Sequence, residues 1–159
     1  MSTALDRRPV SPEGQREQFL TFRLDREEYG IPILQVQEIK GWERATHVPN
    51  SPPYVQGVIN LRGLIVPVVD LRLRFSLPER EADEFTVIIV VNLNGRLAGL
   101  AVDSVTDVID LVADQLCPVP EYEGRTDRDF ISGLAPREGC LLILLDVAHL
   151  LGPEIATPQ

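Results

Sequence analysis

Short runs in which apolar and polar residues alternate dominate the pattern along the chain. In Phe19–Leu24 the residues at even positions are all apolar, which places them on one face of a strand. The polar residues 25–28 predict a turn, and Tyr29–Ile31 predicts a returning strand. The first apolar segment is therefore expected to form a two-stranded unit.

Similar runs continue to the end of the chain. Strands are expected in two β-branched runs on either side of Asn60–Gly63, and in Phe85–Leu93, Arg96–Val102, Val105–Val112, Phe130–Leu134 and Cys140–Leu145, whereas prolines break the segment Cys117–Glu121. About nine short strands, with no helix longer than roughly two turns, predict a mainly β fold built as barrels or as a sandwich.

Turn residues sharpen this prediction. Asn94-Gly95 joins two runs and is a strong hairpin signal, because both residue types tolerate a positive φ. A second hairpin is expected around Pro136–Gly139. Pro67 lies inside the run that follows Gly63 and cannot donate to a sheet, so that strand is expected to be an edge or to carry a bulge there.

Apolar residues recur at helical spacing over short stretches only. Three apolar residues recur at this spacing within Ile33–Lys40, namely Ile33, Val36 and Ile39. They predict a short helix that is stable only when its apolar face is covered, with Val36 partly exposed and its two neighbours free to be buried. A second short helix is expected in Asp146–Leu151, before Gly152-Pro153.

Composition narrows the class of protein. The chain has 159 residues, 44% of them hydrophobic, which suits one domain with a sizeable core. A net charge of −9 repels nucleic acid and anionic lipid, so neither is an expected partner. No apolar run approaches the roughly 18 residues of a membrane span, so we expect a cytoplasmic protein without membrane insertion.

The ends of the chain differ from its middle. Residues 1–17 are polar, contain two prolines and lack periodicity, which predicts a flexible tail, with order beginning near Gln18. A single domain is expected over residues 18–152, followed by a second tail over 153–159.

Candidate chemistry is sparse. His47 and His149 have no cysteine or carboxylate at metal-ligand spacing, so no metal site and no cofactor are expected. Asp103, Asp107 and Asp110 are more simply explained as solvated or capping aspartates than as acid or base catalysts. The two cysteines, Cys117 and Cys140, are expected to be reduced thiols, and Cys117 has no activating histidine nearby. These residues predict no enzyme.

One stretch is specific enough to resemble a known family. Gly57–Gly63, followed two residues later by Val66–Arg72, resembles the core signature of CheW, the family of bacterial chemotaxis coupling proteins. Other segments agree in order and spacing: Glu28–Ile31 with Ile33, Val36–Ile39, Asp103–Val108 and Leu142–Leu144. The resemblance extends from Gln18 to Leu151. It implies two small five-stranded, SH3-like β-barrels around a shared core, with short helices.

The resemblance also implies a function without catalysis. CheW proteins couple membrane chemoreceptors to the histidine kinase CheA by binding the cytoplasmic tip of the receptor in a groove between the barrels. Arg62 matches the arginine of the family signature, and part of the set Ile33, Val36 and Ile39 would line the groove. Glu38, on the other side of this set, could pair with Arg62 and hold it in place.

A second surface is implied for the kinase. In the family, the CheW-like regulatory domain of CheA docks barrel to barrel near the segment that contains Cys117, Glu121 and Tyr122 in this chain. The chain itself would be a monomer that joins CheA in rings or arrays and is recruited to receptor arrays at the inner membrane face. Cys117 departs from the family pattern, in which a basic residue is common at this position.

Two alternatives remain open at this stage. The chain could serve a non-flagellar chemosensory system, such as one for twitching pili or gene regulation. From a different class, it could be a small β-barrel enzyme or ligand-binding module with a pocket between the barrels.

Overall fold

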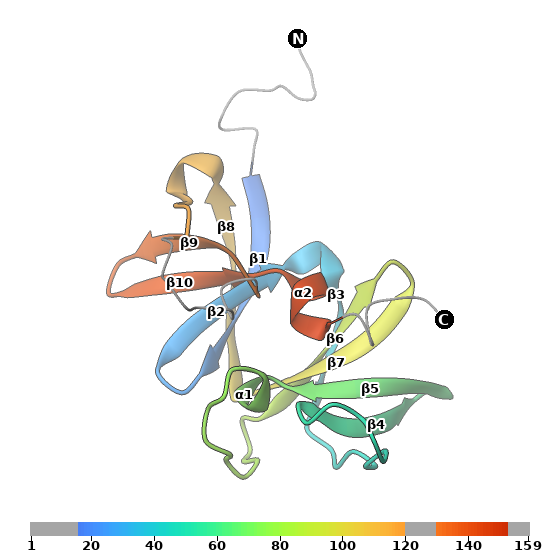
Figure 1. Ribbon diagram of the computed structural model, residues 1–159. Coiled ribbons are helices and arrows are strands. Elements are labelled where there is room, and N and C mark those ends of the chain that lie inside the picture. The colour runs from blue at the N-terminus through green and yellow to red at the C-terminus, as the bar shows by residue number, and fades with distance from the viewer. Residues whose placement is uncertain (1–15, 120–129, 153–159) are drawn as a thin grey trace.

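The computed structural model describes residues 16–119 and 130–152 (Figure 1). The strands are β1 (Arg16–Leu24), β2 (Glu27–Pro32), β3 (Val36–Gly41), β4 (Val55–Leu61), β5 (Leu64–Asp70), β6 (Val87–Leu93), β7 (Arg96–Val102), β8 (Ser104–Val112), β9 (Ile131–Arg137) and β10 (Cys140–Leu145). The helical elements are the 3-10 turns η2 (Ile33–Gln35) and η3 (Ala113–Gln115) and the helices α1 (Leu71–Arg74) and α2 (Val147–Leu151). The predicted mainly β fold is confirmed.

The strands form two five-stranded sheets that meet at α1 and α2 (Figure 1). The first sheet has the order β8-β1-β2-β10-β9 and the second has the order β3-β6-β7-β5-β4. In each sheet one pair of neighbours is parallel, β2 with β10 and β5 with β7, and the other pairs are antiparallel.

Each sheet is closed by a single isolated bridge between its two edges. Past β8, Cys117 exchanges backbone hydrogen bonds of 2.7 and 3.0 Å with Leu134 of β9. Past β3, Thr46 exchanges bonds of 2.8 and 2.9 Å with Val58 of β4. These bridges join the two edges of each sheet at one point and so turn two open sheets into two small barrels.

Glycine is required at the second closure. Gly57 has φ +149°, and a Cβ atom there would lie 2.1 Å from the carbonyl oxygen of Thr46. Any side chain would therefore push the closing segment away from β4.

The two barrels follow one plan. In chain order the second barrel runs β3, β4, β5, α1, β6, β7, and the first runs β8, β9, β10, α2 and then returns to β1 and β2. Corresponding strands pair in the same sense, and each edge strand carries one extra residue at the same place, Gln37 in β3 and Thr106 in β8. Asp70 and Asp146 cap α1 and α2 in the same way. The chain thus contains one complete barrel inserted between the two parts of another.

The apolar residues form three clusters. The interior of the second barrel holds Ile59, Leu61, Val66, Val68, Ile88, Val90 and Ala101, and that of the first holds Phe19, Leu111, Ala135, Leu142 and Leu144. A larger cluster lies between the barrels and draws on both sheets and both helices, including Phe22, Leu71, Ile89, Leu100 and Leu150. We call this third cluster the shared core.

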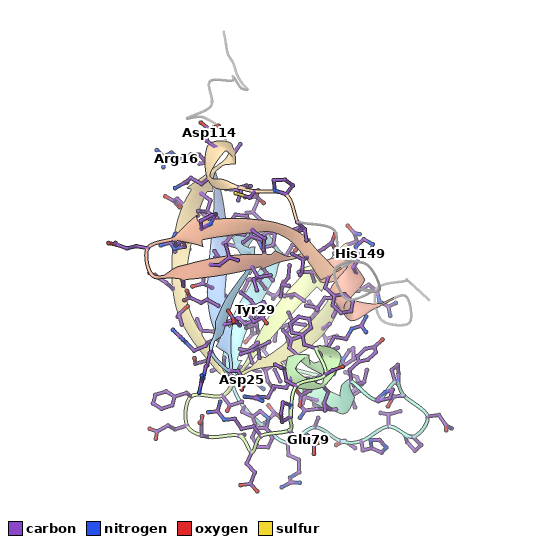
Figure 2. All side chains as sticks on the ribbon, turned by 60° about the vertical axis from the view of Figure 1, so that its left-hand side comes forward. Arg16, Asp25, Tyr29, Glu79, Asp114 and His149 are labelled. Carbon is purple, nitrogen blue, oxygen red and sulfur yellow. The ribbon has the colours of Figure 1, made fainter. Side chains whose placement is uncertain are left out.

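A buried ion network ties the barrels together beside the shared core. Arg72 of α1 is 7% exposed and donates Nε to Asp103 Oδ1 at 2.9 Å and Nη2 to Asp103 Oδ2 at 3.0 Å. It also pairs with Asp25 in the turn between β1 and β2, which Figure 2 labels. Arg80 adds a 2.8 Å bond to Asp103. Asp103 lies between β7 and β8, where the chain passes from one barrel to the other.

Several predicted elements are confirmed. Asn94-Gly95 forms a two-residue turn between β6 and β7, with φ values of 55° and 88°. The hairpin of β9 and β10 exists, with a tighter turn than expected at Glu138-Gly139. The first strand begins at Arg16 rather than near Gln18. The predicted tails, apart from residues 16–17, lie outside the described residues.

The helix predicted over Ile33–Lys40 is wrong. Only η2 is helical, and residues 36–41 form β3. The extra residue Gln37 explains the misleading spacing: Val36 lies opposite Val91 and Ile39 opposite Ile89, so a bulge puts two residues three apart on one face of a strand.

The prediction for Pro67 is also wrong. Strand β5 lies inside the second sheet, between β7 and β4, and the register shift in its pairing with β4 is at Gln56. Pairing of β5 with β7 begins at Val68, so Pro67 precedes that ladder and the missing amide breaks none of its pairs.

Asp103 departs from expectation as well. The sequence predicts a carboxylate that is solvated or caps a turn; Asp103 does accept a 2.9 Å bond from the Asp25 amide, but only 9% of its surface is exposed. Burial raises the pKa of this carboxyl, and its bonds from Arg72, the Asp25 amide and Arg80 outweigh burial and leave the pKa lowered.

We expect Arg72→Met to lower the free energy of unfolding at pH 7 by about 3 kcal/mol, because it leaves Asp103 buried without its main cation. Arg80→Met is the control, since Arg80 is 44% exposed and its loss should cost below about 1 kcal/mol. The measurement is urea unfolding of the chain and both variants.

The pH dependence gives a second check on the same variant. A carboxyl whose folded pKa is lowered stabilises the fold above its unfolded pKa of about 3.9, and this contribution is lost as pH falls through the folded value. The difference between the chain and Arg72→Met should therefore shrink as pH falls below about 4. A difference that is constant from pH 7 to pH 3 would contradict the role given to Asp103.

Candidate functional site

Arg62 lies at the tip of the hairpin between β4 and β5. The two turn residues, Arg62 and Gly63, have φ values of 52° and 91°, and the Gly63 amide donates to Asn60 Oδ1 at 2.8 Å. A positive φ at an arginine is uncommon, because the left-handed region favours glycine and asparagine. Local strain therefore accompanies the exposed guanidinium of Arg62.

Arg62 forms an ion pair with Glu38 of β3, the strand at the opposite edge of the sheet, which closure of the barrel brings close. Nη1 donates to Oε1 at 3.4 Å, and Nη2 bonds Oε2. The Arg62 side chain is 69% exposed and that of Glu38 is 28% exposed. The hydrogen bond from Arg62 lowers the pKa of the Glu38 carboxyl, and the same bond raises the pKa of Arg62. The family resemblance suggested this pair, and the structure brings both residues together.

The three apolar residues of the predicted helix, Ile33, Val36 and Ile39, lie along η2 and β3, and we call them the apolar strip. Ile33 and Val36 are partly buried and pack against the shared core. The sequence allowed Ile39 to be buried, but 44% of its surface is exposed. Glu38 lies opposite Val90, on the other face of β3 from Val36 and Ile39. The strip therefore borders the junction of the barrels, with the ion pair on the far side of the same strand.

Further exposed apolar residues lie on the same elements and were not singled out in the sequence. Leu34 in η2 is 94% exposed, and Leu64 and Ile65, directly after the turn at Arg62, are 57% and 66% exposed. The β-branched run after Gly63 signalled a strand, but periodicity does not say which face of a strand meets solvent when both faces are apolar. Arg62 thus has exposed apolar side chains next to it in the chain.

Of the three residues predicted to face the kinase, only Cys117 lies among the described residues. Cys117 is exposed and closes the first barrel through its backbone. Glu121 and Tyr122 lie outside the described residues. Cys140 is also a free, exposed thiol, and its pKa is raised by desolvation and by the bond to Glu28. A raised pKa reduces the fraction of reactive thiolate.

Two cavities bear on the alternative of a ligand-binding module. One, of about 680 Å³, is lined by Asp70, Arg72, Arg80 and Asp103 among others, and both arginines already bind Asp103. The other, of about 550 Å³, lies against Phe19, Pro32 and Leu144 of the first barrel. Among residues 16–119 and 130–152, no three histidine, cysteine or carboxylate side chains gather as metal ligands.

No helix among the described residues is long and apolar enough to cross a membrane.

Known proteins match nearly the whole chain. The family model for the CheW-like domain matches residues 18–154. Chemotaxis protein CheW of Klebsiella aerogenes is 44% identical over 138 residues, which cover 87% of this chain and 83% of that protein. Chemotaxis protein CheW of Bacillus subtilis is 36% identical, with coverage of 87% and 88%.

A solved structure agrees with the sequence matches. The crystal structure of the scaffolding protein TtCheW from Thermoanaerobacter tengcongensis superposes with a TM-score of 0.78 at 33% identity, covering 86% of this chain and 92% of that one. The fold of the chain therefore agrees with the matches in sequence. The chain belongs to the CheW-like domain family.

Proposed function

We propose that the chain is a non-enzymatic adaptor that couples the cytoplasmic tips of transmembrane chemoreceptors to the histidine kinase CheA. The observation that carries this proposal is the exposed pair between Arg62 and Glu38 of β3, the strand that also presents Val36 and Ile39 of the apolar strip. Relatives over most of the chain are named chemotaxis proteins, and the matching solved structure is named a scaffolding protein.

The receptor would bind along β3. An apolar helix tip needs an exposed apolar surface, and Ile39 supplies one at the margin of the shared core, continued by the partly buried Ile33 and Val36. Arg62 would add charge-assisted hydrogen bonds from the neighbouring hairpin. In the free chain Glu38 holds the guanidinium in place, so less side-chain entropy is lost when a receptor binds.

The backbone at Arg62 supports this role. Asparagine or glycine would fit the left-handed turn position with less strain, and the exposed pair with Glu38 does little to offset that strain. The equivalent two-residue turn of the first barrel, Glu138-Gly139, has a positive φ only at the glycine. An arginine in the strained position is therefore explained by a contact outside the fold.

The kinase would bind a different face. Cys117, Glu121 and Tyr122 belong to this proposed surface, and Pro118 and Pro120 stiffen the chain that carries them. The closure at Cys117 fixes the start of the segment against β9. Two unlike faces on one chain permit head-to-tail association, so the chain and CheA could alternate in rings or arrays at the inner membrane face, with the chain recruited through receptors rather than by insertion.

We expect Arg62→Asn to weaken binding of a receptor cytoplasmic fragment by about tenfold while leaving thermal stability unchanged or slightly raised. Asparagine suits the turn but removes the guanidinium. Glu138→Gln, in the equivalent turn of the first barrel, is the matched control and should change neither quantity. Unchanged receptor affinity in Arg62→Asn would remove Arg62 from the proposed site.

We expect Ile39→Ser to weaken binding of the same receptor fragment several-fold. The variant should lose little stability, because the Ile39 side chain is already 44% exposed. Leu141→Ser is the control, since Leu141 is 43% exposed on β10 of the first barrel. Titration calorimetry of both variants decides the matter, and an equal loss in both would show a general surface effect.

We expect Tyr122→Ser to weaken binding of the CheA regulatory domain by about 1 to 2 kcal/mol, as for a single aromatic contact at an interface, with receptor binding nearly intact. Separate titrations against the two partners test this. Equal losses for both would indicate a folding defect, and a loss for the receptor alone would place the kinase surface elsewhere on the chain.

A further inference from the structure

Arg74, the last residue of α1, makes a set of contacts that the CheW signature does not explain. Its guanidinium carbon lies 4.2 Å from the ring centroid of Tyr54 and 4.3 Å from that of Phe130. Its Nε donates to the carbonyl oxygen of Leu150 at 2.8 Å, and Nη2 donates to that of His149 at 3.3 Å. One side chain therefore has two aromatic and two carbonyl partners.

These partners come from both barrels. Arg74 and Tyr54 belong to the second barrel, one after β5 and the other just before β4. Phe130 precedes β9, and Leu150 and His149 lie on α2, which follows β10, so all three belong to the first barrel. The carbonyls at the C-terminal end of α2 carry partial negative charge, which favours a cation. Arg74 thus bridges the two barrels by stacking and by hydrogen bonds at once.

The bridge continues into a column of aromatic rings. Phe130 stacks on Phe75 at 5.8 Å, Phe75 on Tyr29 at 5.4 Å, and Tyr29 on Phe22 at 5.9 Å between ring centroids. Phe75 comes from the second barrel and the other three rings from the first. Figure 2 labels Tyr29 of this column and His149 on α2, with α1 below both in that view.

The column and the apolar strip meet the same cluster. Phe75, Tyr29 and Phe130 pack against the shared core, and so do Ile33 and Val36. A close-packed interior transmits displacement instead of absorbing it. A change in the angle between the barrels at Arg74 must therefore alter the packing of the strip.

We propose that Arg74 is a positioning residue that fixes the angle between the two barrels and thereby the shape of the apolar strip that receives the receptor. The second half of this statement rests on the proposed function, and the first half does not. The planar guanidinium suits the role because it stacks on rings and donates in plane at the same time, which a lysine ammonium cannot do.

The angle can be measured directly with two spin labels. Cys140 is an exposed thiol on the first barrel. A Cβ atom added at Gly41 of β3 would meet no other atom within 4 Å, so Gly41→Cys adds a label site on the second barrel without a clash. Cys117→Ser removes the remaining thiol. Distances between labels at positions 41 and 140 are then recorded by pulsed electron paramagnetic resonance. The measurement is made on the labelled chain with Arg74 in place, on its Arg74→Ala variant and on its Arg74→Lys variant.

We expect one narrow distance distribution with Arg74, a clearly wider or shifted one in Arg74→Ala, and an intermediate one in Arg74→Lys. Binding of the receptor fragment should weaken by about tenfold in Arg74→Ala. Arg96→Ala, which removes a partly buried arginine from β7 of the second barrel, is the matched control and should keep the narrow distribution. If Arg74→Ala does not fold, the distance distribution of Arg74→Lys is compared with that of Arg96→Ala instead.

The outcomes separate the two halves of the proposal. A distribution in folded Arg74→Ala as narrow as in Arg96→Ala overturns the positioning role. A wider distribution with unchanged receptor affinity overturns the link to the strip. If the chain with Arg74 in place fails to bind the receptor fragment, the proposed function is wrong, while the distance measurement still supports or overturns the role of Arg74 in setting the angle.

Discussion

The shared core is the constraint on which the rest of the structure depends. Each barrel closes around a small interior, with seven buried apolar residues described in the second and five in the first, whereas the cluster between them holds 17. Burial of apolar surface is the main favourable contribution to folding, so most of that contribution arises where the barrels meet. Neither barrel has an interior large enough to be expected to fold alone.

This division of the core explains how the site can contain strain and exposed apolar surface. Arg62 in a left-handed conformation lowers stability, while Leu34 at 94% exposure and a bulged edge strand add little to it. All three lie at the rim of the second barrel or on the connection between barrels, where the shared core holds the backbone in place through Ile33 and Val36. The buried ion network of Arg72 and the contacts of Arg74 add polar constraints on the same junction, one on Asp103 and the other on α2.

The sequence predicted local features well and distant ones poorly. The Asn94-Gly95 turn and the capped helix α2 depend on neighbouring residues, so the local sequence was sufficient to locate them. The spacing of Val36 and Ile39 gave a wrong prediction of a helix, because a bulged strand and a helix can both bring residues three apart to one face. Burial of Asp103 depends on Arg72, which lies 31 residues away in sequence, and no local pattern records that contact. Pairing of Glu38 with Arg62 was suggested only because a family resemblance placed both near one groove.

The common plan of the two barrels gives one short chain two similarly built hairpins with different side chains at their turns. The segments Gly57–Leu71 and Gly133–Val147 occupy equivalent positions, each running from a closing bridge through a hairpin to a capped helix. At the hairpin turn, however, one carries Arg62 and the other Glu138. The duplicated backbone thus places side chains of opposite charge at two equivalent turns. Such differences between equivalent positions suit an adaptor, because two partners that are held in fixed relative positions must also be prevented from exchanging places.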